Sequence, residues 1–287
     1  MFYEYAIDPA VFTSFERFTR LLDAMEPGEG RLLNEYPSAW RTLVFEQLPK
    51  NAGTTRKRAE LRLKDLGTRI LRRRGATFDA TQGWISNAMA ENTRIPFKAV
   101  VVECGQDKTN LVSYEDLDAA HPLWAKFADF MPRDVDAIVK ATEPIFRDAR
   151  QIVLIDPYFY SLPDQRNLLE KLLAVASVDA DVEIFCQERK DRRLLSPGFH
   201  RWPIRLREKQ RLHVFVLRPS ATNKRLHNRY LYTEFGGLQF GDAIRVGDGV
   251  DSLSLLSMQK VQVLREDYCK ATTAFRVVEK FTLPPIK

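Results

Sequence analysis

The sequence predicts an α/β protein in two parts: a helix-rich α/β N-terminal domain of unknown role over residues 1–132 and a C-terminal α/β domain over residues 133–287. In the first part, apolar residues recur mostly at helical spacing. In the second, short β-branched runs alternate with amphipathic segments. Such alternation is typical of a sheet that contains parallel pairs and has helices on its faces. A chain of 287 residues is also long enough for two cores.

The N-terminal domain is expected to begin with a strand and to continue mainly as helices. An alternating aromatic run at residues 2–7 indicates the strand, which ends at Asp8. Further elements are expected from apolar spacing, with helices at 10–26, 38–48, 54–74 and 80–92 and a buried strand at 96–104. Gly75 is well placed to end the third helix. Residues 113–132 have a mixed pattern that predicts no particular element.

The C-terminal domain has a more regular pattern. The expected elements are a helix at 134–149, strands at 151–160, 181–186, 211–217 and 225–233, and a helix at 164–177. The strand, helix and strand from 151 to 186 predict a βαβ unit with parallel pairing. Gly236 and Gly237 indicate a reversal into the strand LQFG, and residues 250–264 are expected to add at least one more strand.

The net charge of +6 is unevenly distributed. Residues 56–74 contain nine Lys and Arg against Glu60 and Asp65, a net +7. Residues 189–229 contain thirteen against Asp191 and Glu208, a net +11. Clusters of this size create a local positive field, which favours polyanionic partners. For residues 56–74 a solvated face of an amphipathic helix explains the pattern equally well.

Composition also bears on the compartment. The three cysteines, Cys104, Cys186 and Cys269, have no metal-ligand spacing, so we expect buried, reduced thiols and neither a metal nor a cofactor. No apolar run approaches the roughly 20 residues that span a bilayer, and the N-terminus lacks the pattern of a secretion signal. These observations predict a cytoplasmic protein without a membrane span.

The segment Leu226–Ala243, LHNRYLYTEFGGLQFGDA, is the most informative for function. Residues two apart on a strand share a face, so His227 and Arg229 are expected to point the same way. Glu234 follows Arg229 by five residues, near the end of the predicted strand. The pattern is therefore H-x-R-x-x-x-x-E, followed by glycines and Phe240-Gly241.

This pattern resembles the phospholipase D superfamily motif H-x-K-x-x-x-x-D, with two conservative replacements. The upstream run IVLIDPYFY strengthens the resemblance. The chain is similar to the single-motif branch, which includes the C-terminal domain of MIT-domain proteins and bacterial proteins that read LHDRY…GG…FG. The resemblance covers roughly residues 135–265 and implies a phospholipase D-like mixed sheet flanked by helices.

The resemblance also implies roles for the three residues. His227 would be the nucleophile or acid, because an imidazole can form a phosphohistidine intermediate. Arg229 would be the phosphate ligand, and Glu234 the acid that orients the imidazole. The family implies no metal. Enzymes of the family pair two motifs, and neither His121, His200 nor His213 begins a second one. Catalysis would therefore require a homodimer that brings two copies of His227 together.

Other residues are candidates for holding phosphate or nucleic acid. The basic segment before the motif contributes six of them, namely Arg205, Arg207, Lys209, Arg211, Lys224 and Arg225. Asp156 and Tyr158 come at the end of a predicted parallel strand, where α/β sheets usually bind ligands, although Asp156 would equally cap a turn. His213 could line the same pocket, but a packed structural role is favoured over it. Packing is likewise favoured over base stacking for Phe159, Tyr160 and Trp202, of which Trp202, beside Arg201 and Arg205, is the one to test for nucleic acid.

Two classes of function follow from these predictions. The first is a metal-independent phosphodiesterase or nuclease that works as a homodimer on nucleic acid. The second is a catalytically inactive binding module or scaffold subunit of a larger complex, for which an acidic lipid headgroup is an alternative ligand to nucleic acid. By analogy with where similar bacterial proteins occur, either would suit a bacterial defence or mobile-element system. The sequence leaves the choice open.

Overall fold

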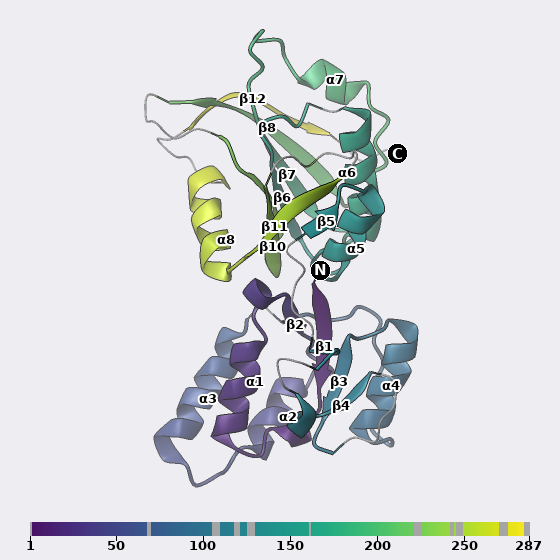
Figure 1. Ribbon diagram of the computed structural model, residues 1–287, viewed down its shortest axis with the longest axis vertical. Helices are drawn as coiled ribbons and strands as arrows, with labels where there is room; N and C mark the ends of the chain where they lie inside the picture. Colours follow the sequence, from purple (N-terminus) through teal and green to yellow (C-terminus); the bar gives the residue numbers. More distant parts are fainter. Residues whose placement is uncertain are drawn as a thin grey trace. The chain divides into compact units, whose positions relative to one another are not determined.

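The protein is described from a computed structural model, in which the chain forms two compact units, Phe2–Phe127 and residues 128–287 (Figure 1). The prediction of an α/β protein is confirmed, since both units combine helices with a sheet. The described residues are 2–283 except 68–69, 105–109, 118–120, 125–129, 161, 221–225, 242–243, 245–248 and 270–274.

The first unit is built on a four-stranded parallel sheet in the order β2-β1-β3-β4. Its strands are β1 (Tyr3–Ile7), β2 (Arg31–Leu33), β3 (Ala99–Val102) and β4 (Leu111–Ser113). In the register, Tyr5 lies between Leu33 and Ala99. β1 is therefore an interior strand, which explains why Tyr5 and Ile7 are fully buried.

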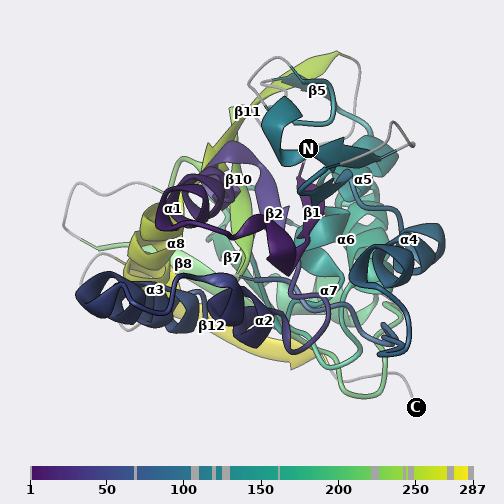
Figure 2. The ribbon, with the colours of Figure 1, turned by 90° about the horizontal axis from the view of Figure 1, so that it is seen from below.

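Helices cover both faces of this sheet. They are α1 (Phe15–Ala24), α2 (Trp40–Gln47), α3 (Gly53–Asp65) and α4 (Trp84–Arg94), with short 3-10 turns at Pro9–Val11, Pro27–Glu29 and Tyr114–Asp116. Side chains of α1, α2 and α3 pack with Tyr5 and Ile7 in one core, whereas Ala88 of α4 packs with Ala6 on the opposite face. Figure 2 shows α1 and α3 on one side of β1 and α4 on the other.

The third predicted helix, 54–74, is much shorter in the structure. α3 ends at Asp65, and Gly67 follows with a positive φ of 46° that a helix does not allow. Leu71 then pairs in parallel with Asn34 beyond the end of β2. The short strands β2 and β4 have too few residues to show a period, so the sequence did not indicate them.

The second unit contains an eight-stranded mixed sheet in the order β12-β8-β7-β6-β9-β10-β11-β5. The pair β6–β7 is parallel, as predicted for the βαβ unit, and so is the pair β7–β8. Every other pair is antiparallel. The strands are β5 (Phe130–Pro132), β6 (Gln151–Ile155), β7 (Asp181–Gln187), β8 (Arg211–Pro219), β9 (Arg229–Thr233), β10 (Gly236–Phe240), β11 (Val250–Leu256) and β12 (Phe275–Leu283).

Helices lie on both faces of this sheet too. They are α5 (Val135–Phe146), α6 (Pro163–Val175), α7 (Ser196–His200) and α8 (Met258–Leu264), which continues into a π-helical turn at Arg265–Cys269. α5 and α6 lie side by side on one face, and α8 covers the other (Figure 1). Val261 and Leu264 of α8 pack against Val153 and Tyr232 of the sheet. The sequence did not indicate α7, α8 or β12.

The boundary between the units lies earlier than predicted. Residues 130–132 form β5, which pairs with β11 at the edge of the second sheet. They therefore belong to the second unit, which begins at residue 128 rather than 133. The mixed pattern of residues 113–132 explains the error, because a three-residue edge strand carries no readable period.

The predicted burial of the cysteines is confirmed at one described position and wrong at another. Cys186 is buried as expected, but Cys104 is exposed, so the expectation of buried thiols is wrong there. Among the helices of the described ranges, none has the length and apolarity needed to cross a membrane.

Candidate phosphate-binding site

The candidate site lies at the edge of the second sheet where the parallel strands β6, β7 and β8 end, which we call the carboxyl edge. β9 runs antiparallel beside β6 and begins at this edge, with Tyr230 opposite Ile155. Asp156 and Arg229 are the next residues outward, so the register brings them together. Ligands of open α/β sheets commonly bind at this edge.

Arg229 is held between a buried carboxylate and an aromatic ring. Its Nε lies 3.9 Å from Oδ1 of Asp156, and its guanidinium carbon lies 5.4 Å from the centre of the Tyr158 ring. The Arg229 side chain is 11% exposed and that of Asp156 is 1% exposed. Within the described residues, the buried Nε of Arg229 has no hydrogen-bond partner. The carboxylate thus balances the charge at a distance that is too long for a hydrogen bond.

Asp156 also fixes the backbone that carries Tyr158. Its Oδ1 accepts a hydrogen bond of 2.9 Å from the backbone N–H of Tyr158, and its own N–H donates to the carbonyl of Phe185 on β7. Both interpretations of Asp156 from the sequence are therefore compatible with the structure: it caps this turn and it faces Arg229. Tyr158 is left 46% exposed, with its ring at the surface.

Two cations flank two aromatic rings at the carboxyl edge, in what we call the aromatic-cation row: Arg229, Tyr158, Tyr160 and Arg189. The rings of Tyr158 and Tyr160 meet edge to face, with centroids 6.4 Å apart, and the guanidinium of Arg189 lies 5.7 Å from the Tyr160 ring. Arg189 is also paired with Asp191, with its Nε 3.3 Å from Oδ1. Burial raises the pKa of Tyr160 to about 12, so its hydroxyl stays neutral at physiological pH. Such a row can offer cations to phosphates and ring faces to bases.

Arg218, at the end of β8, lies at the same edge, but its guanidinium is paired with a carboxylate. Its Nε and Nη2 donate to the carboxylate of Glu188 at 2.7 and 2.6 Å. These hydrogen bonds hold the pKa of Glu188 below its usual range. Arg218 is therefore already neutralised by a bidentate carboxylate, the arrangement in which Arg binds a phosphate.

The two residues before β9, His227 and Asn228, complete this part of the chain. Both are exposed, and Asn228 donates from Nδ2 to the hydroxyl of Tyr230 at 2.9 Å. His227 thus stands two residues from Arg229 at the carboxyl edge, as the motif predicts. Two other histidines of this unit are engaged away from it: the ring of His200 packs on Phe281, and that of His213 reaches Thr282.

Glu234 lies at the opposite edge of the sheet from His227. Glu234 directly follows β9, whose five residues begin at Arg229, and each residue of a strand advances the chain by roughly 3.3 Å. Its carboxylate accepts hydrogen bonds from the backbone N–H groups of Arg150 and Gln151, at 2.7 and 3.3 Å. The expectation that Glu234 orients the His227 ring is therefore wrong, because the acid secures the start of β6 instead.

The predicted basic residues do not gather around Arg229 either. Arg211 begins β8 opposite Asp181, the first residue of β7, which places it at the edge opposite Arg229. Arg207 donates to the carbonyls of Ala174 and Ala176, which end α6, and so serves as a helix cap. His213, two residues into β8, pairs its Nδ1 with Thr282 Oγ1 at 2.9 Å, which confirms its structural role.

Of the remaining predicted residues, those that the structure describes do not lie at the carboxyl edge. Arg205 and Lys209 are exposed on the chain that leads toward the opposite edge, and Lys224 and Arg225 lie outside the described residues. Trp202 is 5% exposed, and its Nε1 donates to Glu170 on α6. It is therefore a packed residue, as the sequence analysis favoured.

Two glycines of the motif are required by the close packing of neighbouring strands. A Cβ on Gly237 would collide with Tyr232 on β9 and would lie 2.9 Å from the carbonyl oxygen of Leu231. A Cβ on Gly241 would collide with the Ser252 hydroxyl on β11. The turn itself is formed by Glu234 and Phe235, and the two predicted turn glycines are instead the first residues of β10.

Tyr158 lies at the carboxyl edge beside Asp156, where the sequence suggested ligand groups. Sequence reasoning missed Arg189, which lies just after β7; that position is the one signal that would have suggested it. Among the described residues, no group of three His, Cys, Asp or Glu side chains is placed to hold a metal ion. Comparisons of the chain with family models, curated proteins and solved structures found no match.

Proposed function

We propose that the second unit is phospholipase D-like and engages the phosphate backbone of nucleic acid at its carboxyl edge. Arg229 is the phosphate ligand in this proposal. Its guanidinium is oriented by Asp156 and by the Tyr158 ring, while its Nε has no hydrogen-bond partner within the described residues. Arg218 at the same edge is paired bidentately and is excluded from this role.

The aromatic-cation row is the observation that carries the proposal for nucleic acid over a lipid headgroup. A headgroup needs one phosphate site, whereas the row continues from Arg229 through two rings to a second cation, Arg189. Arg189 is paired with Asp191 at 3.3 Å, a longer contact than those of Arg218 with Glu188. Ring faces stack on bases regardless of sequence, and they reach bases only when the bases are unpaired. The proposal is therefore most specific for single strands.

Cleavage requires a second histidine beside His227. In one chain, the described part of the second unit places His200 and His213 against Phe281 and Thr282 instead. Two copies of His227 in a homodimer would supply the pair, one imidazole attacking phosphorus and the other protonating the leaving oxygen. A chain that stays monomeric would bind without turnover, which is the second class of function.

Binding is tested by titrating a fluorescent single-stranded oligonucleotide with wild-type protein and with Arg229→Gln. We expect the substitution to raise Kd about tenfold or more, because charge-assisted hydrogen bonds contribute roughly 1.5–3 kcal/mol. Arg207→Gln is the matched control, since this arginine caps α6 and should leave Kd unchanged. Equal affinity of wild type and Arg229→Gln would refute the phosphate role.

Cleavage is tested separately, by analytical ultracentrifugation and by incubating single-stranded DNA and RNA with wild type and His227→Ala. A dimer whose cleavage is abolished by His227→Ala supports the phosphodiesterase. A monomer that binds but never cleaves identifies the binding module. Cleavage that persists in His227→Ala would rule out the histidine mechanism.

A further inference from the structure

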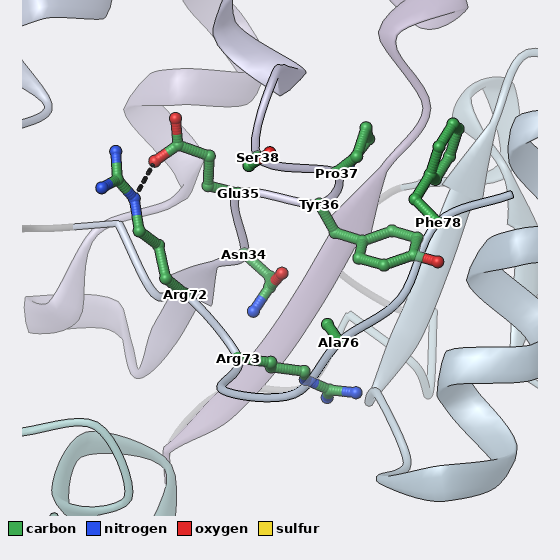
Figure 3. Close-up of a pocket in the computed structure, with 9 residues that line it drawn as sticks. All are labelled: Asn34, Glu35, Tyr36, Pro37, Ser38, Arg72, Arg73, Ala76 and Phe78. Atoms are coloured by element: carbon green, nitrogen blue, oxygen red, sulfur yellow. Dashed lines mark hydrogen bonds and ion pairs between the residues drawn. The ribbon is translucent and has the colours of Figure 1, made fainter. Parts of the chain in front are cut away.

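The first unit contains a pocket of about 330 Å³ that none of the sequence predictions used (Figure 3). It lies beyond the end of β2, where Asn34, Glu35 and Tyr36 follow the strand, and residues 72–78 close its other side. The volume is at the lower end of the roughly 300–1,000 Å³ that ligand pockets occupy. The pocket therefore suits a small ligand.

Asn34 contributes a buried acceptor to this pocket. The residue is 1% exposed, and its Nδ2 donates to the Glu4 carboxylate at 2.5 Å, which fixes the orientation of the amide. Its Oδ1 is buried and has no hydrogen-bond partner within the described residues. Figure 3 shows this oxygen on the side of Tyr36 and Ala76. An unmade hydrogen bond on a buried polar atom is unfavourable, so a donor supplied by a ligand would be favoured.

Arg72 contributes a cation whose terminal nitrogens are available to a ligand. Its Nε donates to Glu35 Oε2 at 2.6 Å, and its side chain is 68% exposed. The Glu35 carboxylate, 3% exposed, is also held by Arg41. The charge of Glu35 is thus shared between two arginines, and Arg72 keeps its terminal nitrogens for an anion. Figure 3 shows the guanidinium at one end of the pocket.

Two rings form the other end. Tyr36 and Phe78 meet edge to face with centroids 5.8 Å apart, and Phe78 is 38% exposed. In Figure 3 the amide of Asn34 lies between these rings and Arg72. A matching ligand has a planar apolar part, a hydrogen-bond donor and an anionic group, in that order.

From this arrangement we infer that the pocket binds a nucleoside monophosphate, with the base against Tyr36 and Phe78, a base N–H on Asn34 Oδ1 and the phosphate on Arg72. An aromatic amino acid also has a ring, a donor and an anion. Its ammonium, however, would find no unpaired carboxylate here, because Glu35 is held by Arg41 and Arg72 and Glu4, beside Asn34, is held by Arg73. Arg72 keeps its terminal nitrogens for an anion, so the pocket favours an anionic ligand whose donor is neutral.

The test is calorimetric titration of the whole protein with AMP, adenosine and purine riboside 5′-monophosphate, which lacks the exocyclic amine. We expect AMP to bind, and adenosine and the purine riboside nucleotide each to bind about tenfold more weakly, since each loses one hydrogen-bonded group. Arg72→Gln should reduce AMP affinity to that of adenosine, and Phe78→Ala should weaken both ligands equally.

Arg58→Gln is the matched control, an exposed arginine on α3 that does not line the pocket. Arg72→Gln leaves Arg41 on Glu35, so the variant should keep its fold, which circular dichroism checks. AMP affinity that survives both Arg72→Gln and Phe78→Ala, or no AMP binding at millimolar concentration, would overturn the inference. Binding of phenylalanine or tryptophan in place of AMP would overturn it too. Arg229→Gln should have no effect on AMP binding, which separates this site from the proposed nucleic-acid site.

Discussion

Arg229 and Arg218 are the same residue type at the same edge of one sheet, yet their surroundings give them different chemistry. Arg218 donates two hydrogen bonds to Glu188, whereas Arg229 stays 3.9 Å from Asp156 and faces a ring. A paired guanidinium must give up its hydrogen bonds to the carboxylate before it can bind a phosphate. The geometry of the acidic partner therefore distinguishes a binding arginine from a structural one.

Substitutions at Glu234 test whether this residue stabilises the fold or takes part in binding. Glu234→Ala should lower the free energy of unfolding by about 1–3 kcal/mol, because it leaves the N–H groups of Arg150 and Gln151 without their acceptor. Glu234→Gln retains one acceptor oxygen and should cost less. Urea denaturation measures both. Oligonucleotide affinity of the folded variants should match wild type; a loss of affinity at unchanged stability would restore a direct role for this acid.

Asp8, at the end of β1, should make stability depend on pH. Burial raises its pKa above the usual value of 3.8, so the folded state holds its proton more tightly than the unfolded state. Stability contributed by the protonated form is present below the usual pKa and is lost as pH rises through the raised one. Asp8→Asn keeps an acceptor for the Ala10 N–H and removes this loss.

The variant should therefore be more stable than wild type at pH 7.5, and its advantage should shrink toward pH 4. Urea denaturation at the two pH values measures the difference. An advantage that is the same at both would show that Asp8 is not destabilised by its charge in the folded protein.

At the scale of elements, the β9–β10 hairpin depends on a close approach that Gly237 allows. Gly237→Ala places a methyl group against Tyr232 and Leu256 on the two neighbouring strands. Overpacking of this kind costs typically about 1–3 kcal/mol, so the melting temperature should fall by several degrees. Gly198→Ala, in α7 with no atom within 4 Å of the new Cβ, is the control and should leave it nearly unchanged. Equal melting temperatures for the two variants would contradict the packing argument.

Elements with strong local signals could be predicted from the sequence. The helix at 134–149 begins where Asp134 accepts a hydrogen bond from the Ala137 N–H, an ordinary N-cap that the sequence makes visible. The end of α3 could not be predicted, because the path of the chain beyond it depends on the pairing of Leu71 with Asn34, far away in the sequence. β12 is equally nonlocal, since it pairs with β8 across more than fifty residues.

At the scale of the whole molecule, the site was predictable only where the motif and the strand register agree. His227 and Arg229 lie at one edge because Arg229 begins β9 and His227 is only two residues before it; the expected strand period does not apply to His227, which precedes the strand. The same motif suggested that Glu234 was near, although seven residues of extended chain carry it to the other edge. Tyr158 follows β6 directly and could be placed at this edge from the sequence, whereas Arg189 joins the site through parallel pairing of β6 and β7, which no local pattern encodes.

The distribution of basic residues over the second unit gives the last prediction. The sequence treated 189–229 as one basic stretch, but the structure divides it between the loop after β7, which carries Arg189 of the aromatic-cation row, and the chain that leads to the opposite edge. Of these two groups, the first adjoins the aromatic-cation row, and Arg218, at the end of β8, lies at the same edge but is paired with Glu188. Lys190 and Arg193 in that loop are exposed, as are Arg205 and Lys209 in the other group.

Two double variants, Lys190→Gln with Arg193→Gln and Arg205→Gln with Lys209→Gln, each lower the net charge from +6 to +4. If the carboxyl edge binds single strands, the first pair should reduce the slope of log K against log salt by up to about 1.4, since each phosphate contact contributes roughly 0.7. The second pair should leave the slope unchanged, because its charges are not at the edge. Fluorescence titration at salt concentrations from roughly 50 to roughly 300 mM measures the slope for each variant. Equal reductions in the two variants would mean that net charge, rather than the carboxyl edge, holds the strand.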